Sequence, residues 1–567
     1  KTVTRNVTLK KGKTLEEDFE IEEDAIALDG VVVSANRSET TRRMAPTLVN
    51  VVDLKLFETT NSSTLSQGLN FQPGVRVETN CQNCGFQQVR INGLDGPYTQ
   101  ILIDSRPVFS ALSGVYGLEQ IPASMIERVE VMRGGGSALF GSSAIAGTIN
   151  IITKEPLRNS GQLSHTITSL GGSSSFDNNT SLNASLVTDD HRAGLYIFGQ
   201  NRYRSGYDYD GDGFTELPKL KNQTVGFRSY LKTSTYSKLT FEYHHMQEFR
   251  RGGDMLNRPP HEAHIAEQLQ HSIDGGSLKF DYFSPDEKNR LSVFASAANT
   301  DRDSYYGPGN DPLKAYGKTT DLTAMGGAQY VHTFDKCFFM PSDLTAGLEY
   351  NRDRLKDNMW GYNRHTDQTV NIYSAFLQNE WKNDRWGILI GGRLDKHNMV
   401  DNVIFSPRAN LRFNPTQNIN LRLSYSSGFR APQAFDEDMH IENVGGTVAM
   451  IERAKDLKEE KSQSFSVSAD MYHRFGAFQT NLLIEGFYTR LTDVFVLGKP
   501  YDRGDGILVK TRSNGPGAKV MGLTLEGKVA YLSILQIQAG LTLQRSRYDE
   551  PHKWHDDAPA EKKIFRT

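Results

Sequence analysis

The sequence is poor in cysteine, in long apolar runs and in net charge. Its three cysteines among 567 residues are too few for a disulfide framework. No apolar run approaches the roughly 20 residues that a membrane-spanning helix needs, and the mean hydropathy is −0.51, which excludes a helical membrane protein. With 64 Lys and Arg against 67 Asp and Glu, the formal net charge of −3 gives no reason to expect a nucleic-acid partner.

Beyond about residue 160, the sequence consists of short segments in which every second residue is apolar. Examples are 238–246 (KLTFEYHHM), 418–426 (NINLRLSYS) and 535–543 (LQIQAGLTL). Period-two alternation predicts β-strands with one apolar face. A soluble sandwich would show the same alternation, but it rarely needs so many strands or connections as long as 250–271 and 432–461. The pattern therefore predicts a transmembrane antiparallel β-barrel.

The region before residue 156 has a different pattern. It contains compact strand signals at 100–104 (QILID) and 126–132 (IERVEVM), a glycine-rich turn at 134–136, and room for short helices. A polar linker, 22–43, precedes these features. Together they predict a small α/β domain of about 100 residues in front of the barrel.

Four strings in this region resemble the plug signature of the TonB-dependent outer-membrane receptors. They are ILIDSRPVF, IPASMIERVEV, RGGGSALFG and GTINIITK, which begin at residues 101, 121, 133 and 147. The resemblance covers essentially the whole chain. It implies a barrel of roughly 22 strands when complete, surrounded by the lipid of the bacterial outer membrane, with the N-terminal α/β plug domain inside the lumen.

The resemblance also divides the chain into domains. Residues 1–24 resemble the end of a carboxypeptidase-regulatory-like domain of Bacteroidetes receptors, 25–43 hold the TonB box and linker, and 44–156 form the plug. Residues 157–567 form a barrel that is expected to lack its last strands. Because an open sheet edge is costly in hydrocarbon, we expect the native protein to be longer.

Within the linker, 27–36 (ALDGVVVSAN) resembles the TonB box, the segment that such receptors offer to TonB in the periplasm. Its β-prone valines suit strand addition to the edge of a partner's sheet. The resemblance implies TonB, with ExbB and ExbD, as partners. The alternative is a linker strand packed under the plug. The predicted box comprises Asp29, Gly30, Val31, Val32, Val33, Ser34 and Ala35.

Cys81 and Cys84 form a Cys-x-x-Cys pair in the plug. A closed four-ligand zinc site cannot be assembled from the plug alone, because no second cysteine pair exists and no histidine precedes His165. By resemblance, the pair lies on a plug loop that faces the ligand. A disulfide between Cys81 and Cys84 is one interpretation, and a reduced pair or a soft-metal contact is the other. Cys337 is expected to be a lone barrel residue.

The segment 207–216 (YDYDGDGFTE) places Asp208, Asp210 and Asp212 at alternate positions, with Glu216 following. Such carboxylates supply the oxygen ligands that Ca²⁺ prefers, although the bidentate glutamate of an EF-hand is missing. Gly-Asp segments are also common as plain turns. A Ca²⁺ site and an ordinary turn are both compatible with this segment.

Three histidines are candidates for ligand contact. His261 and His264 lie in a histidine-rich part of the barrel, but their spacing is not that of the His-Glu-x-x-His zinc proteases, and a solvated role is equally compatible. His440 is the strongest candidate. It lies between GFRAP at 428–432 and AKDL at 454–457, which resemble the boxes that bracket a ligand histidine in haem receptors.

The resemblance implies active import of a scarce metal chelate, with haem or cobalamin ahead of a ferric siderophore. The alternatives are a glycan or peptide importer that works with a surface-exposed lipoprotein, and a passive docking barrel. No convergent acid, base and nucleophile indicate an enzyme. Further candidates for ligand contact in the plug are Gln82, Asn83, Phe86, Tyr98 and Tyr116.

Overall fold

The computed structural model of the chain describes residues 30–106, 118–119, 121–308, 315–444, 447–532 and 534–551. Asp29 and Tyr116 lie outside the described residues, as does the segment 1–24. None of the helices in the described ranges has the length and apolar composition of a membrane span.

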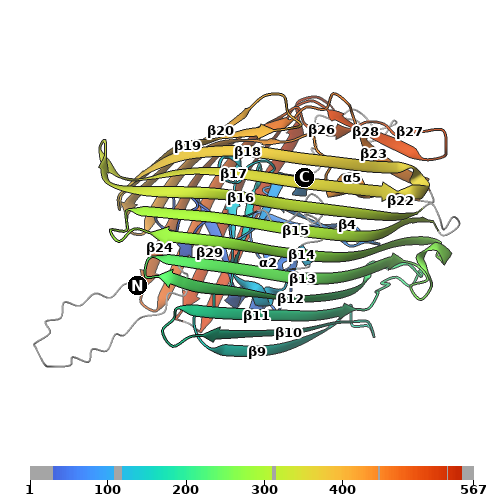
Figure 1. The fold of residues 1–567 in the computed structure, drawn as a ribbon, viewed down its shortest axis with the longest axis horizontal. Helices are drawn as coiled ribbons and strands as arrows, with labels where there is room; N and C mark the ends of the chain where they lie inside the picture. Colours follow the sequence, from blue (N-terminus) through green and yellow to red (C-terminus); the bar gives the residue numbers. More distant parts are fainter. Residues whose placement is uncertain are drawn as a thin grey trace, which may run out of the picture.

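Seventeen antiparallel strands in the described ranges form a barrel, in which each strand pairs with the next barrel strand along the chain (Figure 1). Their order and pairing agree with the predicted antiparallel barrel. The strands are β9 (Ser160–Ser169), β10 (Phe176–Val187), β11 (Ala193–Arg204), β12 (Lys219–Ser234), β13 (Ser237–Gly253), β14 (Ile265–Phe283), β15 (Asn289–Pro308), β16 (Tyr316–Cys337), β17 (Met340–Met359), β18 (Arg364–Lys382), β19 (Trp386–His397), β20 (Ile404–Thr416), β21 (Ile419–Arg430), β24 (Glu460–Phe475), β25 (Phe478–Thr492), β29 (Ala518–Tyr531) and β30 (Leu535–Tyr548).

The two faces of the barrel wall differ in polarity. Val225, Leu231 and Phe241 are exposed on the outer face of β12 and β13, whereas Arg202 of β11 and Arg250 of β13 are buried on the inner face. The outer face is therefore apolar and the lumen polar, as expected for a barrel in a lipid bilayer. This arrangement confirms the transmembrane barrel that period-two alternation predicts.

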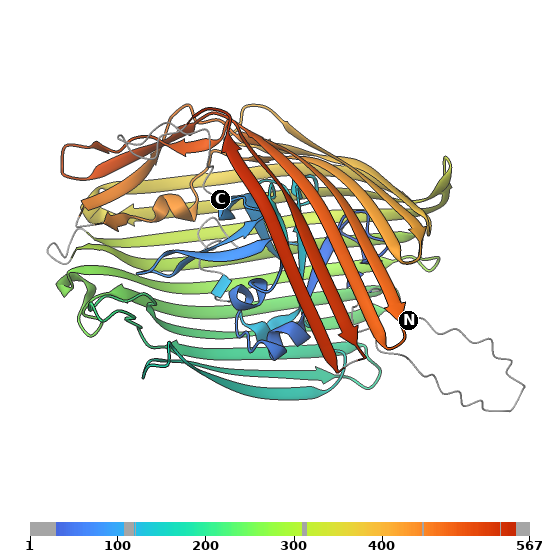
Figure 2. The same cartoon turned by 180° about the vertical axis from the view of Figure 1, so that it is seen from behind.

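The plug domain lies inside the barrel (Figure 2). Its central sheet has the strand order β3-β7-β8-β6, and a hairpin, β4-β5, extends from it. Buried apolar residues such as Val52, Val129 and Ile149 form its core. The plug elements are β3 (Val49–Asp53), α1 (Leu54–Thr59), α2 (Leu65–Leu69), β4 (Val75–Cys81), β5 (Phe86–Ile91), η1 (Gly96–Tyr98), β6 (Thr99–Ile103), η2 (Ala123–Met125), β7 (Ile126–Arg133), α4 (Ser137–Phe140) and β8 (Gly147–Thr153).

Buried ion pairs fix the plug to the barrel wall. Arg133 of the plug lies 2.8 Å from both Glu485 and Glu526 of the barrel. On another side, Glu119 accepts from Arg250 of β13 at 2.8 Å. Because an unpaired charge is costly in a buried position, these pairs define where the plug sits in the lumen.

The longest connections gather at one end of the barrel. The connection from β21 to β24 contains α5 (Asp436–Met439), β22 (Glu442–Val444) and β23 (Thr447–Arg453). The connection from β25 to β29 contains β26 (Phe495–Leu497), β27 (Tyr501–Asp502) and β28 (Leu508–Asn514). Parallel pairing of β23 with β28 joins the two connections into one small sheet over the barrel mouth.

Candidate functional site

A tight turn between β4 and β5 carries both plug cysteines. The amide of Gly85 donates to the carbonyl of Cys81 at 3.0 Å, and the amide of Cys84 points at the Cys81 sulfur at 3.5 Å. Gly85 has a φ of +67°, a left-handed conformation that favours glycine. The Cys-x-x-Cys-Gly string therefore folds into a local turn that brings the two sulfur atoms within 4.8 Å of each other.

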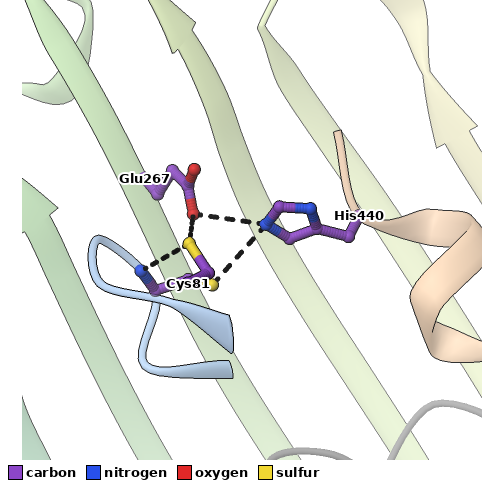
Figure 3. A group of neighbouring side chains, drawn as sticks. Cys81, Glu267 and His440 are labelled. Atoms are coloured by element: carbon purple, nitrogen blue, oxygen red, sulfur yellow. Dashed lines mark hydrogen bonds and ion pairs between the residues drawn. The ribbon is translucent and has the colours of Figure 1, made fainter. Parts of the chain in front are cut away.

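Four side chains from three separate parts of the molecule meet at this turn. Cys81 and Cys84 come from the plug, Glu267 from barrel strand β14, and His440 from the connection after α5 (Figure 3). The Cys81 sulfur donates to Oε2 of Glu267 at 3.1 Å. Nε2 of His440 lies 3.6 Å from the Cys84 sulfur and 3.5 Å from Oε2 of Glu267. We call these four residues the apex cluster.

Polar contacts hold the connection that carries His440 against the barrel. The amide of His440 donates to the carbonyl of Asp436 at 3.2 Å. The buried Asp436 carboxylate pairs with Arg302 of β15 at 2.7 Å, and Arg364 of β18 donates to the carbonyl of Met439 at 2.9 Å. These contacts position the imidazole of His440 against the plug hairpin.

Apolar side chains enclose the apex cluster. The rings of Phe86 and Tyr306 meet the imidazole of His440 edge-on, with centroid separations of 5.7 and 5.5 Å. Cys84 is fully buried, and only 4% of Glu267 is exposed. Such a shell excludes water and strengthens electrostatic interactions among the four polar side chains.

Hydrogen bonding within the cluster shifts two pKa values. For Cys81, the hydrogen bond with Cys84 is the largest influence, and it lowers the pKa to about 7 against the opposing effect of burial. For His440, burial favours the neutral ring, but hydrogen bonds with Cys81 and Glu267 raise its pKa to about 10. At neutral pH the cluster therefore combines a readily ionised thiol with a protonated imidazole.

The structure unites several of the residues singled out from the sequence, namely Cys81, Cys84, Phe86 and His440. No disulfide joins Cys81 and Cys84 in the structure, and Cys337 is not part of the cluster. Sequence reasoning missed Glu267. It lies 186 residues from Cys81, and alternation along its strand indicates only which face it occupies.

The other plug candidates have different surroundings. Gln82 is exposed at the tip of the turn. Asn83 lies against the backbone of Gly252 in β13, where an added Cβ would come within 1.9 Å of the Asn83 carbonyl oxygen. Tyr98 is buried and donates to Glu460 of the barrel at 2.9 Å. Of these three, Gln82 alone is exposed, and Tyr98 links the plug to the wall.

His261 and His264 are not in the apex cluster. Nδ1 of His261 lies 2.9 Å from the hydroxyl of Tyr316. Nδ1 of His264 lies 2.6 Å from the Asp254 carboxylate, and its side chain is exposed. The structure therefore separates these two histidines from His440.

The candidate calcium loop is an exposed turn. Carboxylate oxygens of Asp208, Asp210 and Glu216 lie within 4.8 Å of one another, whereas Asp212 is not in this group. The Asp208 carboxylate accepts from the amides of Gly211 at 2.7 Å and Gly213 at 2.9 Å. These bonds stabilise the turn by themselves.

The segment that resembles the TonB box lies at the other end of the plug. Its strand β1 (Val31–Val32) pairs with β2 (Thr40–Thr41). Val32, Ser34 and Ala35 are fully buried. In this conformation the segment is packed against the plug, which corresponds to the alternative that we considered from the sequence.

The barrel and the plug domain each match a family of known proteins. Residues 146–564 match the family described as TonB dependent receptor-like, beta-barrel, and residues 41–148 match the TonB-dependent Receptor Plug Domain. A vitamin B12 transporter of Vibrio vulnificus strain CMCP6 is 24% identical over 425 residues, which cover 72% of this chain and 64% of the transporter. The chain thus spans less than two thirds of that relative's length. The transporter of strain YJ016 is 33% identical over 174 residues, which are 30% of this chain and 28% of that protein.

Solved structures of siderophore receptors share the fold. The receptor PirA from Acinetobacter baumannii has a TM-score of 0.74 at 18% identity, over 90% of this chain and 82% of that one. PirA from Pseudomonas aeruginosa has a TM-score of 0.71 at 16% identity, over 88% and 85% of the two chains. At this identity, the likeness concerns the fold alone.

Proposed function

The chain belongs to the TonB-dependent receptor family, whose members reside in the outer membrane, and from this premise we propose that it actively imports a scarce metal chelate. The observation that carries the proposal is the plug inside the barrel. A barrel of this width would otherwise enclose an aqueous channel, so the plug makes passage conditional on its own displacement. No step of such transport requires covalent chemistry on the cargo.

Energy for the displacement comes, in our proposal, from TonB with its partners ExbB and ExbD. The segment 30–35 is the proposed contact, since its valines favour addition to a sheet edge. In the structure this segment already forms a strand pair with Thr40 and Thr41. TonB would therefore have to replace β2 as the pairing partner.

For the cargo, we propose cobalamin first and a ferric siderophore second. The similarity to vitamin B12 transporters supports cobalamin. Haem, the other tetrapyrrole, is less well supported because Nε2 of His440 already faces Cys84 and Glu267. A glycan or peptide cargo with a surface lipoprotein has no specific observation in its favour.

A chelate as large as cobalamin or a ferric siderophore requires the outer connections to move, or it binds above them. A cavity of about 180 Å³ between plug and barrel is lined by residues that include Gln88, Phe140, Arg393 and Phe435. Pockets for drug-sized ligands begin at roughly 300 Å³. We also propose that the exposed loop at 208–216 rearranges and that Asp208, Asp210 and Glu216 bind Ca²⁺ there.

The proposal is tested with purified receptor and with cells. Cyanocobalamin and a ferric siderophore are each mixed with the receptor, and bound absorbance is measured after gel filtration. Uptake of the retained chelate is then compared in cells with and without TonB. We expect retention of cobalamin and uptake only with TonB. Failure of both chelates to bind would show that the cargo class is wrong, and uptake without TonB would refute energy coupling.

A further inference from the structure

We propose that the apex cluster, Cys81, Cys84, Glu267 and His440, binds one bare thiophilic metal ion, with Zn²⁺ as the preferred ion. This site is additional to chelate import. The inference rests on the geometry of the four side chains and holds whichever chelate the receptor carries.

The donor atoms of the cluster are two sulfurs, one imidazole nitrogen and one carboxylate oxygen. Zn²⁺ takes this mixture in four-coordinate protein sites. Ca²⁺ and Mg²⁺ require oxygen ligands, and the carboxylate makes the set harder than the all-sulfur sets that suit Cu⁺. The ligand chemistry therefore favours a divalent ion that is intermediate between hard and soft, such as Zn²⁺.

Three separations between donor atoms are close to the edges of a tetrahedron around such an ion, and all the donor atoms lie within 4.8 Å of one another. Zinc bonds of about 2.0–2.3 Å imply edges of roughly 3.3–3.8 Å between ligand atoms. The observed separations are 3.6 Å from the Cys84 sulfur to His440, 3.5 Å from His440 to Glu267, and 3.1 Å from Glu267 to the Cys81 sulfur. An ion at the centre would need only small side-chain shifts.

The plug turn contributes a second feature typical of thiolate sites. The two cysteines are separated by two residues, the spacing that allows both sulfurs of one turn to bind the same ion. The amide of Cys84 points at the Cys81 sulfur at 3.5 Å, and an N–H group in this position stabilises negative charge on sulfur. The left-handed Gly85 closes the turn.

The surroundings favour an ion over a chelate. Phe86 and Tyr306 pack around His440, and the hydrophobic cluster that contains Cys84 also includes Met359 and Met450. All four positions of a tetrahedral ion would be filled by protein atoms, which leaves no open position for a bound chelate.

A bound ion would have a structural role, because its ligands come from three separate parts of the molecule. It would connect the plug hairpin, barrel strand β14 and the connection that carries His440. An ion bound there would tie the outer connection down to the plug apex. Displacement of the plug would therefore have to break at least two metal bonds.

The test uses the full chain in detergent, treated with reductant and a chelator and then freed of both. Zn²⁺ is titrated against a chromophoric competitor, and Co²⁺ serves as a spectroscopic probe of thiolate coordination. We expect one equivalent of Zn²⁺, a thiolate-to-cobalt charge-transfer band, and X-ray absorption with two sulfurs at about 2.3 Å and two lighter atoms at about 2.0 Å.

Two variants and two matched controls assign the ligands. Cys84→Ser and His440→Ala should each weaken Zn²⁺ binding by at least about 100-fold, because even outer-shell partners contribute up to that much. Cys337→Ser and His264→Ala lie outside the cluster and should leave the titration unchanged. Circular dichroism checks that each variant is folded.

Four results would overturn the inference, and the first three come from the binding and spectroscopic measurements. They are absence of the cobalt charge-transfer band from the reduced wild-type chain, equal Zn²⁺ binding by all four variants, and an X-ray absorption spectrum without sulfur neighbours. A Cys81–Cys84 disulfide that excludes Zn²⁺ even after reductant treatment would do the same. Cobalamin binding by Cys84→Ser is measured in parallel, so that failure of the chelate proposal is seen separately from failure of the ion site.

Discussion

The two ends of the plug are held to the barrel by different kinds of contact. At the outer end, the plug reaches Glu267 and His440 through the side chains of Cys81, Cys84 and Phe86. At the inner end, the backbone carbonyls of Ala35 and Asn36 accept from Arg408 and Gln378 of the barrel. The sulfur and nitrogen atoms of these side chains can bind a metal ion, whereas backbone groups can exchange one hydrogen-bonding partner for another.

A single carboxylate of the plug holds the inner segment. Oε2 of Glu130 accepts from the amides of Val33 at 2.9 Å and Ser34 at 2.8 Å, and from the Ser34 hydroxyl at 2.8 Å. The barrel adds Glu380, which accepts from Asn36 at 2.7 Å, and Arg408, which donates to the Ala35 carbonyl at 2.9 Å. Release of this segment requires all of these bonds to be given up.

The largest expected effect is at the inner end. Replacement of residues 30–35 by a Gly-Ser sequence of equal length removes the valines that favour strand pairing. We expect chelate uptake to fall to the level of cells without TonB, while chelate binding by the purified receptor is unchanged. Radiolabelled uptake and gel-filtration binding measure the two quantities. Normal uptake by this variant would exclude the segment as the TonB contact.

At the outer end, Asp436→Ala removes a carboxylate that pairs with the buried Arg302. Loss of one member of a buried pair costs about 3–5 kcal/mol, so residues 436–441 should lose protection from amide hydrogen exchange. Glu442→Ala is the matched control, because its pair with Lys510 is partly exposed and is worth only about 0–1 kcal/mol. Equal loss of protection in both variants would contradict this assignment.

A smaller effect is expected from Glu130→Gln, which weakens the hydrogen bonds to Val33 and Ser34. Bonds to a charged acceptor contribute about 1.5–3 kcal/mol, so amide exchange at these two residues should accelerate by at least about tenfold. Affinity for the purified periplasmic domain of TonB should rise. Glu127→Gln, on the exposed side of the same strand, is the control. Unchanged exchange would mean that Glu130 does not hold the segment.

The smallest expected effect is that of Gly85→Ala. The left-handed conformation costs a residue with a Cβ about 1–2 kcal/mol, and the Cβ would lie 3.0 Å from Arg250 Nη1. Zn²⁺ affinity should fall by roughly tenfold if the turn distorts. Gly476→Ala introduces a similar strain at φ +58° in an open turn far from the cluster, and its Zn²⁺ titration should match that of the wild type. An identical loss in both variants would refute a local effect.

The sequence predicts local structure well because local structure has local causes. Alternation over 238–246 and 418–426 predicts β13 and β21, and the glycine after Cys84 is compatible with the tight turn. That the plug alone cannot close a four-ligand site stays a prediction; the plug supplies two of the four side chains of the apex cluster.

The apex cluster itself could not be predicted. Cys84 and His440 are 356 residues apart, and their contact depends on how the barrel wraps around the plug. No local pattern distinguishes Glu267 from other inward-facing residues of a strand. The burial of Ser34 and Ala35 likewise depends on Glu130, which lies 96 residues beyond Ser34.

The parallel pairing of β23 with β28 has a mechanical consequence for the barrel mouth. Ala449 to Arg453 are matched in register with Leu508 to Arg512, so one connection cannot lift without shearing the other. The two behave as a single flap with four anchor points on the rim. Because Arg512 of β28 also pairs with Asp438 at 2.9 Å, a substitution on β28 will be felt by the connection that carries His440.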